Sequence, residues 1–498
     1  MSPPTLDPIE RGTPARPQSA EASTTYLRKW GRAAACLPQY GVLATIVALT
    51  MCLLHPRIGV RDDDGYSYIV GAYSLQASHA YTDLSGSPLN HWPPGYSLLL
   101  SRFSTPLNAA LIFNYIALVL ASWMLFRLAK NSKWDTHEAL GLAIALTLGF
   151  LGGLSTSAKP DILAYCVFLC GGALCLRAGS VPRLAAYLMW SILICFKLIA
   201  VAFVPALLLT DLAGWRNDRR IKDLAVPIIG AAFWSATVAT LLWFNQKATG
   251  SMIPASHGKP TLLSLPRALS QLLESIPRQL IVNWYGSIRQ PAVWAPFTMV
   301  LVLAIAALVT LRPHPGRERL RNIGITILAV SGMLQIVRQF DGDARLMGYG
   351  LILILLACRP KTGSANRWLL YGAASLALFV ANGLATNSEG ANDPRYSRLA
   401  VAAANAGLPV GEIYSNSSHI LDIHIKRATR KATQPTSIGI GAYFLLVSLP
   451  RFDAIASTVW PVESPAGGWC CVWSIPGASL LRRQAAGNLR HHGEKLCQ

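Results

Sequence analysis

Residues 61–100 read RDDDGYSYIVGAYSLQASHAYTDLSGSPLNHWPPGYSLLL. Three consecutive acids, Asp62 to Asp64, directly follow the first hydrophobic segment of the chain. A polar and aromatic loop comes next, and a turn at Trp92 to Tyr96 then leads back into apolar sequence. The rest of the chain reads as a scaffold that holds this loop at one surface, so the loop is the first place to look for function.

The composition is that of a membrane protein. The chain has 498 residues, of which 52% are hydrophobic and only 14% are charged. Soluble domains carry about 25% charged residues, so much of this surface is expected to face lipid. Apolar runs near the length that crosses a hydrocarbon core of about 30 Å recur along the chain. We therefore predict an α-helical polytopic membrane protein.

The formal net charge is +20, a balance that also suits proteins that bind nucleic acid. The basic residues do not form one patch, however, but fall in short clusters between the apolar runs. Cytoplasmic loops carry such clusters under the positive-inside rule. The expected partner of these clusters is therefore the anionic inner leaflet of the membrane, and nucleic acid is not a predicted partner.

We expect about eleven transmembrane helices. Residues 184–210 are too long for one span and have Lys197 at their centre, so we interpret them as two short helices that meet near the outer surface. With that division every loop placed inside carries at least two Lys or Arg residues, the N-terminus is cytoplasmic and the C-terminus lies outside. The other spans are expected at about 37–54, 107–127, 138–154, 161–177, 225–244, 292–311, 322–337, 346–358 and 368–384.

Three regions follow from this topology. Residues 1–35 are rich in Pro, Ser, Thr and Arg, which predicts a disordered cytoplasmic tail and not a signal peptide. Residues 36–384 are the membrane domain, with residues 55–106 as its first outer loop. Residues 385–498 are expected to form a small extracytoplasmic α/β domain. Its expected elements are a helix at 395–406 and strands at 411–414, 443–449 and 471–475.

Ten cysteines occur, and most lie in or beside apolar runs, where they are expected to be small packing residues. Cys470, Cys471 and Cys497 lie in the polar C-terminal region. In an oxidising compartment either Cys470 or Cys471 could bridge to Cys497, and the sequence leaves that pairing open. The adjacent pair lacks the CxxC spacing of a zinc or redox site.

The acids of the first outer loop are the first candidates for catalysis. Asp64, Tyr68, Ala72 and Leu75 share one face of an expected helix that begins at Asp64, and Asp is favoured at a helix N-terminus. A carboxylate at a membrane surface can take a proton from an acceptor hydroxyl or bind a divalent cation. The alternative interpretation is a solvated acidic loop with a capping role only.

The turn HWPPGY at residues 91–96 is the second candidate element. Its prolines stiffen the turn and remove backbone donors, and Trp and Tyr side chains prefer the headgroup zone of a membrane. One interpretation is an interfacial anchor. The other is that the turn docks against a lipid-borne substrate, with His91, Trp92 and the preceding Tyr68 as substrate-binding residues.

Several ionisable residues fall at or near the expected outer ends of spans. Charged groups at membrane depth are costly, so residues of this kind are functional candidates. The alternative for each is mutual salt bridging or snorkelling. Together they would supply cations near a phosphate and an acid near a sugar, and they are Lys159, Asp161, Lys197, Arg338 and Arg345.

These motifs resemble those of the GT-C glycosyltransferases, and most of all the family 39 branch with protein O-mannosyltransferases, lipid A aminoarabinose transferases and lipopolysaccharide-core sugar transferases. The specific part is the first outer loop, with its acids, the DxxxY helix start at 64–68, the Gly-Ser-Pro turn at 86–88 and the WPPGY return. Weaker matches extend the resemblance over most of residues 37–430, and they are Lys159-Pro160-Asp161, Lys197, Asn245 to Pro254, Arg345, and Ile413 to Asn416.

The resemblance implies a reaction and roles for the candidate residues. Enzymes of this family move a sugar from a polyprenyl-phosphate carrier to an acceptor at the extracytoplasmic face. Asp64 would then be the catalytic acid residue, as general base or cation ligand, with Asp63 as the alternative because the run of three leaves the register open. Lys197 and Arg345 would neutralise the lipid phosphate as it leaves. Gly65 stands where a second acid is usual, which counts against metal binding by Asp64 more than against base catalysis.

We therefore expect an inverting sugar transferase of a bacterial inner membrane. Its donor would be a polyprenyl-phosphate-linked sugar and its acceptor an envelope lipid, polysaccharide or protein. No cofactor is demanded by the sequence, although Asp64 could hold a divalent cation such as Mg²⁺ or Mn²⁺. The alternatives are a transporter or flippase for a lipid-linked sugar, which would need an internal repeat and polar residues at mid-span, and a non-catalytic subunit of an envelope assembly machine.

Overall fold

The structure is a computed structural model. It describes residues 37–54, 63–83, 88–89, 93–155, 158–177, 179–218, 224–250, 252, 266, 311–314, 316–338, 345–360, 394–410, 413–415, 425, 430–431, 441–447, 469–475 and 478–483. The expected N-terminal tail, the expected span at 368–384, nearly all of the expected span at 292–311, and Cys497 lie outside these residues.

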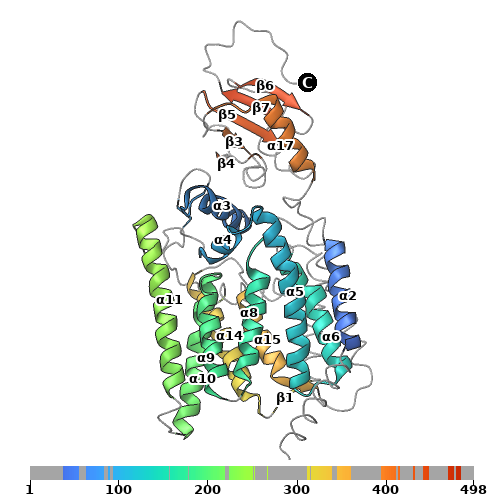
Figure 1. The fold of residues 1–498 in the computed structure, drawn as a ribbon, viewed down its shortest axis with the longest axis vertical. Coiled ribbons are helices and arrows are strands. Elements are labelled where there is room, and N and C mark those ends of the chain that lie inside the picture. Colours follow the sequence, from blue (N-terminus) through green and yellow to red (C-terminus); the bar gives the residue numbers. More distant parts are fainter. Residues whose placement is uncertain are drawn as a thin grey trace, which may run out of the picture.

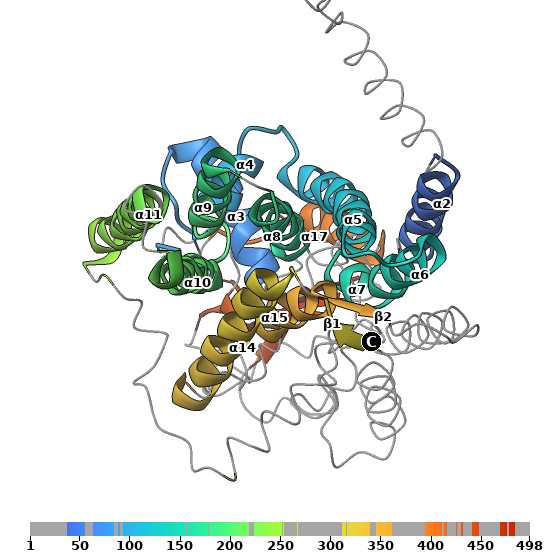
Figure 2. The same cartoon turned by 90° about the horizontal axis from the view of Figure 1, so that it is seen from below.

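The described part of the chain is mostly helical, and its long helices run side by side in one bundle (Figure 1, Figure 2). The bundle helices are α2 (Leu37–Leu54), α5 (Pro106–Asn131), α6 (Thr136–Leu146), α8 (Asp161–Cys175), α9 (Ser180–Leu193), α10 (Phe203–Asp218), α11 (Ala225–Thr249), α14 (Glu318–Arg338) and α15 (Arg345–Leu356). Each of them overlaps a span expected from the sequence. The shorter elements are α3 (Asp63–Ser78), α4 (Gly95–Leu100), the π-helical η2 (Thr147–Leu151), α7 (Gly152–Ser155), the 3-10 helix η3 (Leu198–Ala202), and the antiparallel pair β1 (Leu311–Pro313) and β2 (Cys358–Pro360).

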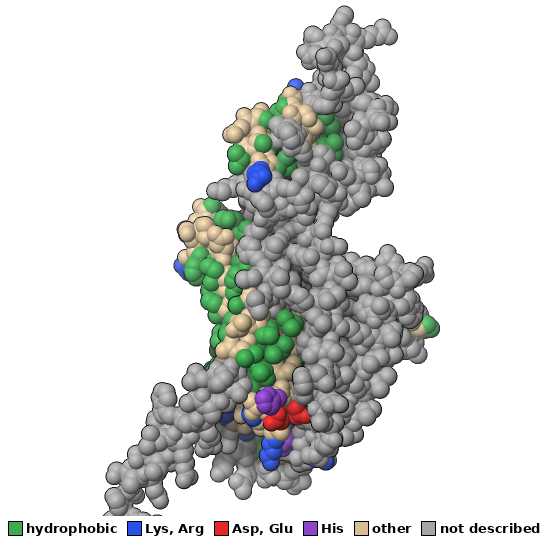
Figure 3. All heavy atoms as spheres, turned by 90° about the vertical axis from the view of Figure 1, so that its right-hand side faces the viewer, with side chains coloured by type: hydrophobic (Ala, Val, Ile, Leu, Met, Phe, Trp, Pro, Cys, Tyr) green, Lys and Arg blue, Asp and Glu red, His purple; other side chains and the backbone are tan. Residues whose placement is uncertain are grey.

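Large apolar side chains are exposed on the outer faces of the bundle. They are Ile112, Ile116, Leu120 and Trp123 on α5, and Ile228, Ile229, Phe233 and Trp243 on α11. Figure 3 shows hydrophobic side chains along one side of the bundle, with charged and histidine side chains at the end away from the C-terminal sheet. By length and composition, two of the described helices could cross a membrane, at Pro106–Asn131 and Ala225–Ala248. Exposed apolar faces of this extent are favourable in contact with lipid.

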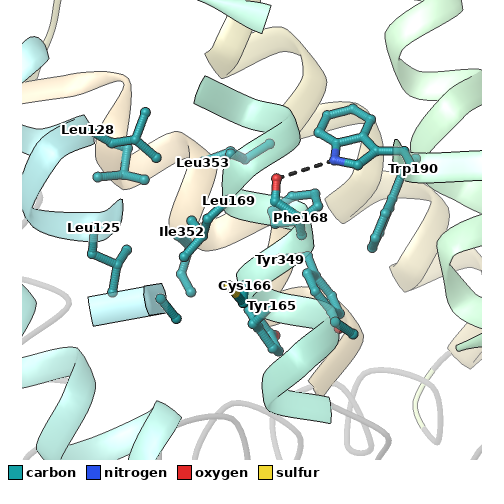
Figure 4. Packing of buried hydrophobic residues seen from close by; sticks show 14 of the residues in the cluster. Leu125, Leu128, Tyr165, Cys166, Phe168, Leu169, Trp190, Tyr349, Ile352 and Leu353 are labelled. Atoms are coloured by element: carbon teal, nitrogen blue, oxygen red, sulfur yellow. Dashed lines mark hydrogen bonds between the residues drawn. The ribbon is translucent and has the colours of Figure 1, made fainter. Parts of the chain in front are cut away.

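Aromatic side chains fill the centre of the bundle. Tyr165 of α8 stacks on Tyr349 of α15, with ring centroids 3.8 Å apart and an angle of 6° between the rings. Phe168, almost one turn further along α8, packs against Trp190 of α9, and the Trp190 indole N–H donates to the Phe168 carbonyl oxygen at 3.2 Å (Figure 4). Aromatic contacts of this kind stabilise the core beyond the area that they bury. They fix α9 and α15 against α8.

The interruption expected at the centre of residues 184–210 is present. α9 ends at Leu193, and Lys197 directly precedes η3, which continues into α10. The backbone of Lys197 is extended, with φ −147° and ψ 113°. The charged residue at the centre of a long apolar run thus coincides with the point where the chain turns back. This is expected, because placing an ammonium group within the lipid would cost free energy.

The expected span at 138–154 is not one regular helix. α6 passes at Thr147 into the π-helical η2 and then into α7. The buried Thr147 hydroxyl donates to the Ala143 carbonyl oxygen at 2.6 Å and lies 2.6 Å from the Ser122 hydroxyl of α5. A π-helical turn widens the helix locally, and here it coincides with a buried polar contact between two helices that the hydrophobic pattern alone did not indicate.

A buried carboxylate joins three helices at the opposite end of the bundle from Lys197. Asp211 of α10, whose side chain is 3% exposed, pairs through Oδ2 with Arg183 Nη2 at 2.9 Å and through Oδ1 with Arg319 of α14. The Tyr187 hydroxyl of α9 also donates to Oδ2, at 2.9 Å. Both arginines belong to basic clusters that the sequence places in cytoplasmic loops, so part of that charge has a structural role.

Asp211→Asn is expected to lower the free energy of unfolding by about 3 kcal/mol, because two partly buried arginines would then face each other without a counter-charge. Thermal unfolding in detergent measures the effect as a lower midpoint. Asp135→Asn is the matched control: the Asp135 carboxylate caps α6 by accepting from the His137 backbone N–H at 3.1 Å, and Asn caps a helix as well as Asp. Equal midpoints for Asp211→Asn and wild type would contradict the prediction.

The described C-terminal residues form a helix and a mixed five-stranded sheet. The helix is α17 (Pro394–Ala406), and the strand order is β4 (Arg430–Lys431), β3 (Ile413–Ser415), β5 (Tyr443–Val447), β7 (Ala478–Arg483) and β6 (Trp469–Ile475). β3 runs parallel to β4 and β5, whereas β7 runs antiparallel to β5 and β6. Its small core joins Leu399 of α17 to Ile413, Leu445 and Leu480. In Figure 1 this unit lies beyond α3 and α4, at the same end of the bundle.

β3, β5 and β6 overlap the strands expected from the sequence, whereas β4 and β7 were not expected. β7 alternates buried Ala478 and Leu480 with more exposed positions, and its Arg482 is exposed. The hydrophobic residues of β7 are Ala478, Leu480 and Leu481, and a run this short does not stand out in the sequence.

Candidate functional site

α3 begins within the acidic run of the first outer loop. Asp63 is its first residue and Asp64 its second, so both carboxylates belong to a first turn, where backbone N–H groups favour acids. The body of the helix is buried: Tyr68 is 1% exposed and Ile69 is fully buried. The helix predicted to begin at Asp64 is therefore present and begins one residue earlier, as a packed helix with acids at its start.

α4, which follows the Trp-Pro-Pro turn, packs against both α3 and the segment before Lys197. The Gly95 N–H donates to the Cys195 carbonyl oxygen at 2.9 Å, and the Ser97 hydroxyl donates to the Tyr68 carbonyl oxygen at 2.8 Å. The Tyr68 hydroxyl in turn donates to the Phe196 carbonyl oxygen at 3.4 Å. Cys195 and Phe196, which directly precede Lys197, thus accept hydrogen bonds from residues of the first outer loop, although the two segments are far apart in the sequence.

Gly95→Ala is expected to lower the free energy of unfolding by about 1–3 kcal/mol, the usual effect of overpacking. A Cβ at this position would lie 2.5 Å from the Cys195 carbonyl oxygen, which belongs to rigid backbone, so α4 would have to move away. A lower midpoint of thermal unfolding is the measurement. Gly214→Ala in α10 is the control, because a Cβ there meets nothing within 4 Å and Ala favours a helix by about 1 kcal/mol. A Gly95→Ala protein as stable as the Gly214→Ala protein would refute this contact.

Lys197 forms a buried ion pair with the first residue of α8. Its Nζ lies 2.6 Å from Asp161 Oδ1, and the two side chains are 11% and 4% exposed. Lys159, just before α8, is also buried at 5% exposure, and the neighbouring Ala158 packs in one apolar cluster with Tyr68 and other residues of α3 and α4. The salt bridge that was one of the two interpretations of these charges is therefore present between Lys197 and Asp161. It joins the two residues in one buried site beside α3 and α4.

Arg345 is the first residue of α15. Tyr349, one turn later, stacks on Tyr165 of α8, and Tyr165 itself is one turn after Asp161. Arg345 and Asp161 thus each come one helical turn before one member of the stacked pair Tyr349–Tyr165. The starts of α15 and α8 therefore lie at the same end of the bundle. Arg338 is the last residue of α14, and the chain between it and Arg345 joins these two helix ends.

The structure leaves some sequence predictions open. His91 and Trp92 lie outside the described residues, and Asp63, Asp64 and Arg345 are placed by their helices and not by their side chains. Within the described part of the chain, no three His, Cys, Asp or Glu side chains come together as metal ligands, and Asp161 is engaged by Lys197. A divalent cation at Asp64, which the sequence allows but does not demand, stays a prediction.

Tyr96 corrects the sequence-based interpretation of the WPPGY turn. An interfacial anchor should place this phenol at the membrane surface, yet Tyr96 is fully buried and packs edge-on against Tyr68, with ring centroids 5.5 Å apart. Tyr96 was not among the site residues predicted from the sequence. Its position directly after Gly95 was the available signal, because a glycine there permits the close approach to Cys195 that carries the tyrosine inward.

No family model and no curated protein matches the chain. Among solved structures, ArnT from Cupriavidus metallidurans bound to undecaprenyl phosphate is similar with a TM-score of 0.50 and 14% identity, over 90% of this chain and 98% of ArnT. The apo state of the same ArnT has a TM-score of 0.48 at 13% identity, with the same coverage. The Archaeoglobus fulgidus oligosaccharyltransferase with a tethered acceptor peptide has a TM-score of 0.44 at 13% identity, over 92% of this chain and 75% of that protein.

The similarity to ArnT at a TM-score of 0.50 extends over nearly the full length of both proteins. Identity of 14% is low enough that this similarity describes the fold and not the reaction. The sequence resemblance noted above predicted this same fold from the first outer loop. The chain has the GT-C fold of the membrane glycosyltransferases.

Proposed function

We propose that this protein is a glycosyltransferase that moves a sugar from a polyprenyl-phosphate carrier to an envelope acceptor on the periplasmic side of a bacterial inner membrane. The proposal is carried by one observation: the first outer loop, the start of α8 and Lys197 meet at one end of the bundle through the Gly95–Cys195 and Lys197–Asp161 contacts. An ArnT structure of the same fold is bound to undecaprenyl phosphate, which supports a polyprenyl-phosphate donor.

In the proposed reaction, Asp64 accepts the proton of an acceptor hydroxyl while that oxygen attacks the anomeric carbon of the sugar. The bond between the anomeric carbon and the phosphate oxygen breaks in the same step, and polyprenyl phosphate leaves with the electron pair. Attack from the face opposite the leaving group inverts the anomeric configuration. The phosphate gains negative charge as it leaves, so nearby cations stabilise the transition state more than the bound substrate.

Lys197 is the cation best supported for this role. Its ammonium is mostly buried, and the Asp161 carboxylate holds it in one position. In such a site a fixed charge interacts more strongly with a phosphate than it would in water. Asp161 thus orients Lys197 and balances its charge when no phosphate is bound. The remaining proposed substrate contacts are Lys159, Arg345, Tyr68, His91 and Trp92, with Asp63 as the alternative base.

The proposal is tested with purified protein in proteoliposomes that contain polyprenyl-phosphate sugars radiolabelled in the sugar. A transferase moves the label to an envelope acceptor and releases unlabelled polyprenyl phosphate. A transporter or flippase moves the label across the bilayer while it is still attached to the lipid, and a non-catalytic subunit does neither. Mass analysis of envelope glycans from cells with and without the gene then identifies the sugar and the acceptor.

A further inference from the structure

The hydroxyl of Tyr96 is a buried polar group without a hydrogen bond to any residue that the structure describes. Tyr96 is fully buried, and its hydroxyl oxygen has no hydrogen-bond partner in the part of the chain that the structure describes. Buried hydroxyls are nearly always hydrogen-bonded, because a donor without a partner costs free energy. An exception therefore calls for an explanation, and one explanation is a bound ligand.

The tyrosine is held firmly in place. The adjacent Gly95 N–H donates to the Cys195 carbonyl oxygen at 2.9 Å, and the Tyr96 ring packs edge-on against Tyr68, whose hydroxyl donates to Phe196. Tyr96 thus stands between α3 and the two residues that precede Lys197. Phenylalanine would fill the same apolar space, so packing does not explain why a hydroxyl is present at this position.

The surroundings also determine the protonation state of this hydroxyl. Burial raises the pKa of the Tyr96 phenol well above its ordinary value, and the negative charge of Asp161 raises it further. The phenol therefore keeps its proton at neutral pH and can donate it in a hydrogen bond. Tyr96 also lies near the ion pair between Asp161 and Lys197, because the preceding residue, Gly95, is hydrogen-bonded to Cys195, two residues before Lys197.

We propose that the Tyr96 hydroxyl donates a hydrogen bond to a phosphate oxygen of the polyprenyl-phosphate donor, beside the ammonium of Lys197. This inference rests on the proposed function. A neutral, rigidly held donor next to a lysine is suited to an oxygen whose negative charge grows as the carbon–oxygen bond breaks. Tyr96 then acts on the leaving phosphate, whereas Asp64 acts on the acceptor hydroxyl.

Tyr96→Phe tests this role, because it removes the hydroxyl and leaves the ring. The expected result is a fall in kcat of about 10²- to 10³-fold, as for the loss of a donor that stabilises a developing anion, with a smaller change in KM. Binding of undecaprenyl phosphate to the purified protein should weaken as well, since this product carries the full negative charge. The thermal unfolding midpoint should stay at or above that of wild type, because the lost hydroxyl has no partner in the described part of the protein.

Tyr187→Phe is the matched control, since its hydroxyl donates to Asp211 at the other end of the bundle. It should lower the unfolding midpoint and leave kcat and product binding unchanged, the reverse of the pattern expected for Tyr96→Phe. A Tyr96→Phe protein with wild-type kcat and wild-type affinity for undecaprenyl phosphate would overturn the inference. If the wild-type protein transfers no sugar, the proposed function fails, and unchanged lipid binding in Tyr96→Phe would then reject the phosphate contact separately.

Discussion

Replacing Asp64 by Asn is expected to lower the rate of sugar transfer by about 10²- to 10⁴-fold, which is what a positioned general base contributes. Asn has nearly the same size as Asp, and loss of one negative charge from the first turn of a helix costs only about 0.3–1 kcal/mol, so α3 should still form and pack. The amide cannot take the proton of the acceptor hydroxyl, and kcat should fall while KM for the lipid-linked donor changes little. Transfer of a radiolabelled sugar in proteoliposomes measures both constants.

Two other aspartates of the first outer loop are compared with this variant. Asp63→Asn tests the register, because the run of three acids allows either Asp63 or Asp64 to be the base, and the variant with the larger loss identifies it. Asp83→Asn removes a carboxylate from the same outer loop but outside the proposed site, and it should transfer sugar at the wild-type rate. Full activity in both Asp63→Asn and Asp64→Asn would exclude an aspartate of the first turn of α3 as the base.

Lys197→Met is expected to lower the rate of transfer by about 10²- to 10³-fold, the range found when one group that stabilises a transition-state anion is removed. It should also lower the free energy of unfolding by about 3 kcal/mol, because it leaves the Asp161 carboxylate buried without its partner. Thermal unfolding and the transfer assay on the same preparations separate these two effects. Lys197→Arg should keep the protein stable but recover only part of the activity, since the guanidinium has a different shape.

The double variant with Lys197→Met and Asp161→Asn decides whether Lys197 acts on the substrate or only on the fold. With both charges removed, no buried charge is left unpaired, and the unfolding midpoint should return close to that of wild type. Transfer should stay low, because the ammonium proposed to face the phosphate is still missing. Asp161→Asn alone completes the double-mutant cycle. Recovery of transfer in the double variant would show that the lysine is only structural.

Much of the fold was predictable because it depends on neighbouring residues in the chain. The length and hydrophobicity of each run predicted the bundle helices, and the charge of Lys197 predicted the break between α9 and α10, since an ammonium is costly in lipid. The acids at 63–64 predicted the start of α3 to within one residue. The π-helical turn at Thr147 was missed, because it coincides with a contact to Ser122 on another helix.

The candidate site was predictable only in part. The sequence selected Lys197 and Asp161 as separate charges, but their pairing depends on where α8 begins relative to the end of α9. One of the two interpretations of the turn made Tyr96 a surface anchor, because its residue type favours the headgroup zone. Its burial follows from the approach of Gly95 to Cys195. Residue type indicated which chemistry was available, whereas contacts between distant segments determined where it is used.

The order of apolar and basic segments by itself determined that this is a helical membrane protein and predicted an acidic outer loop, because hydrophobic length, charge and helix propensity are properties of contiguous residues. Only the tertiary structure decided that Asp161 holds Lys197, that α4 is bound to the segment before that lysine, and that the Tyr96 hydroxyl is buried without a protein partner among the described residues. Those features arise from the packing of helices far apart in the chain, and no local pattern encodes which side chains such packing brings together.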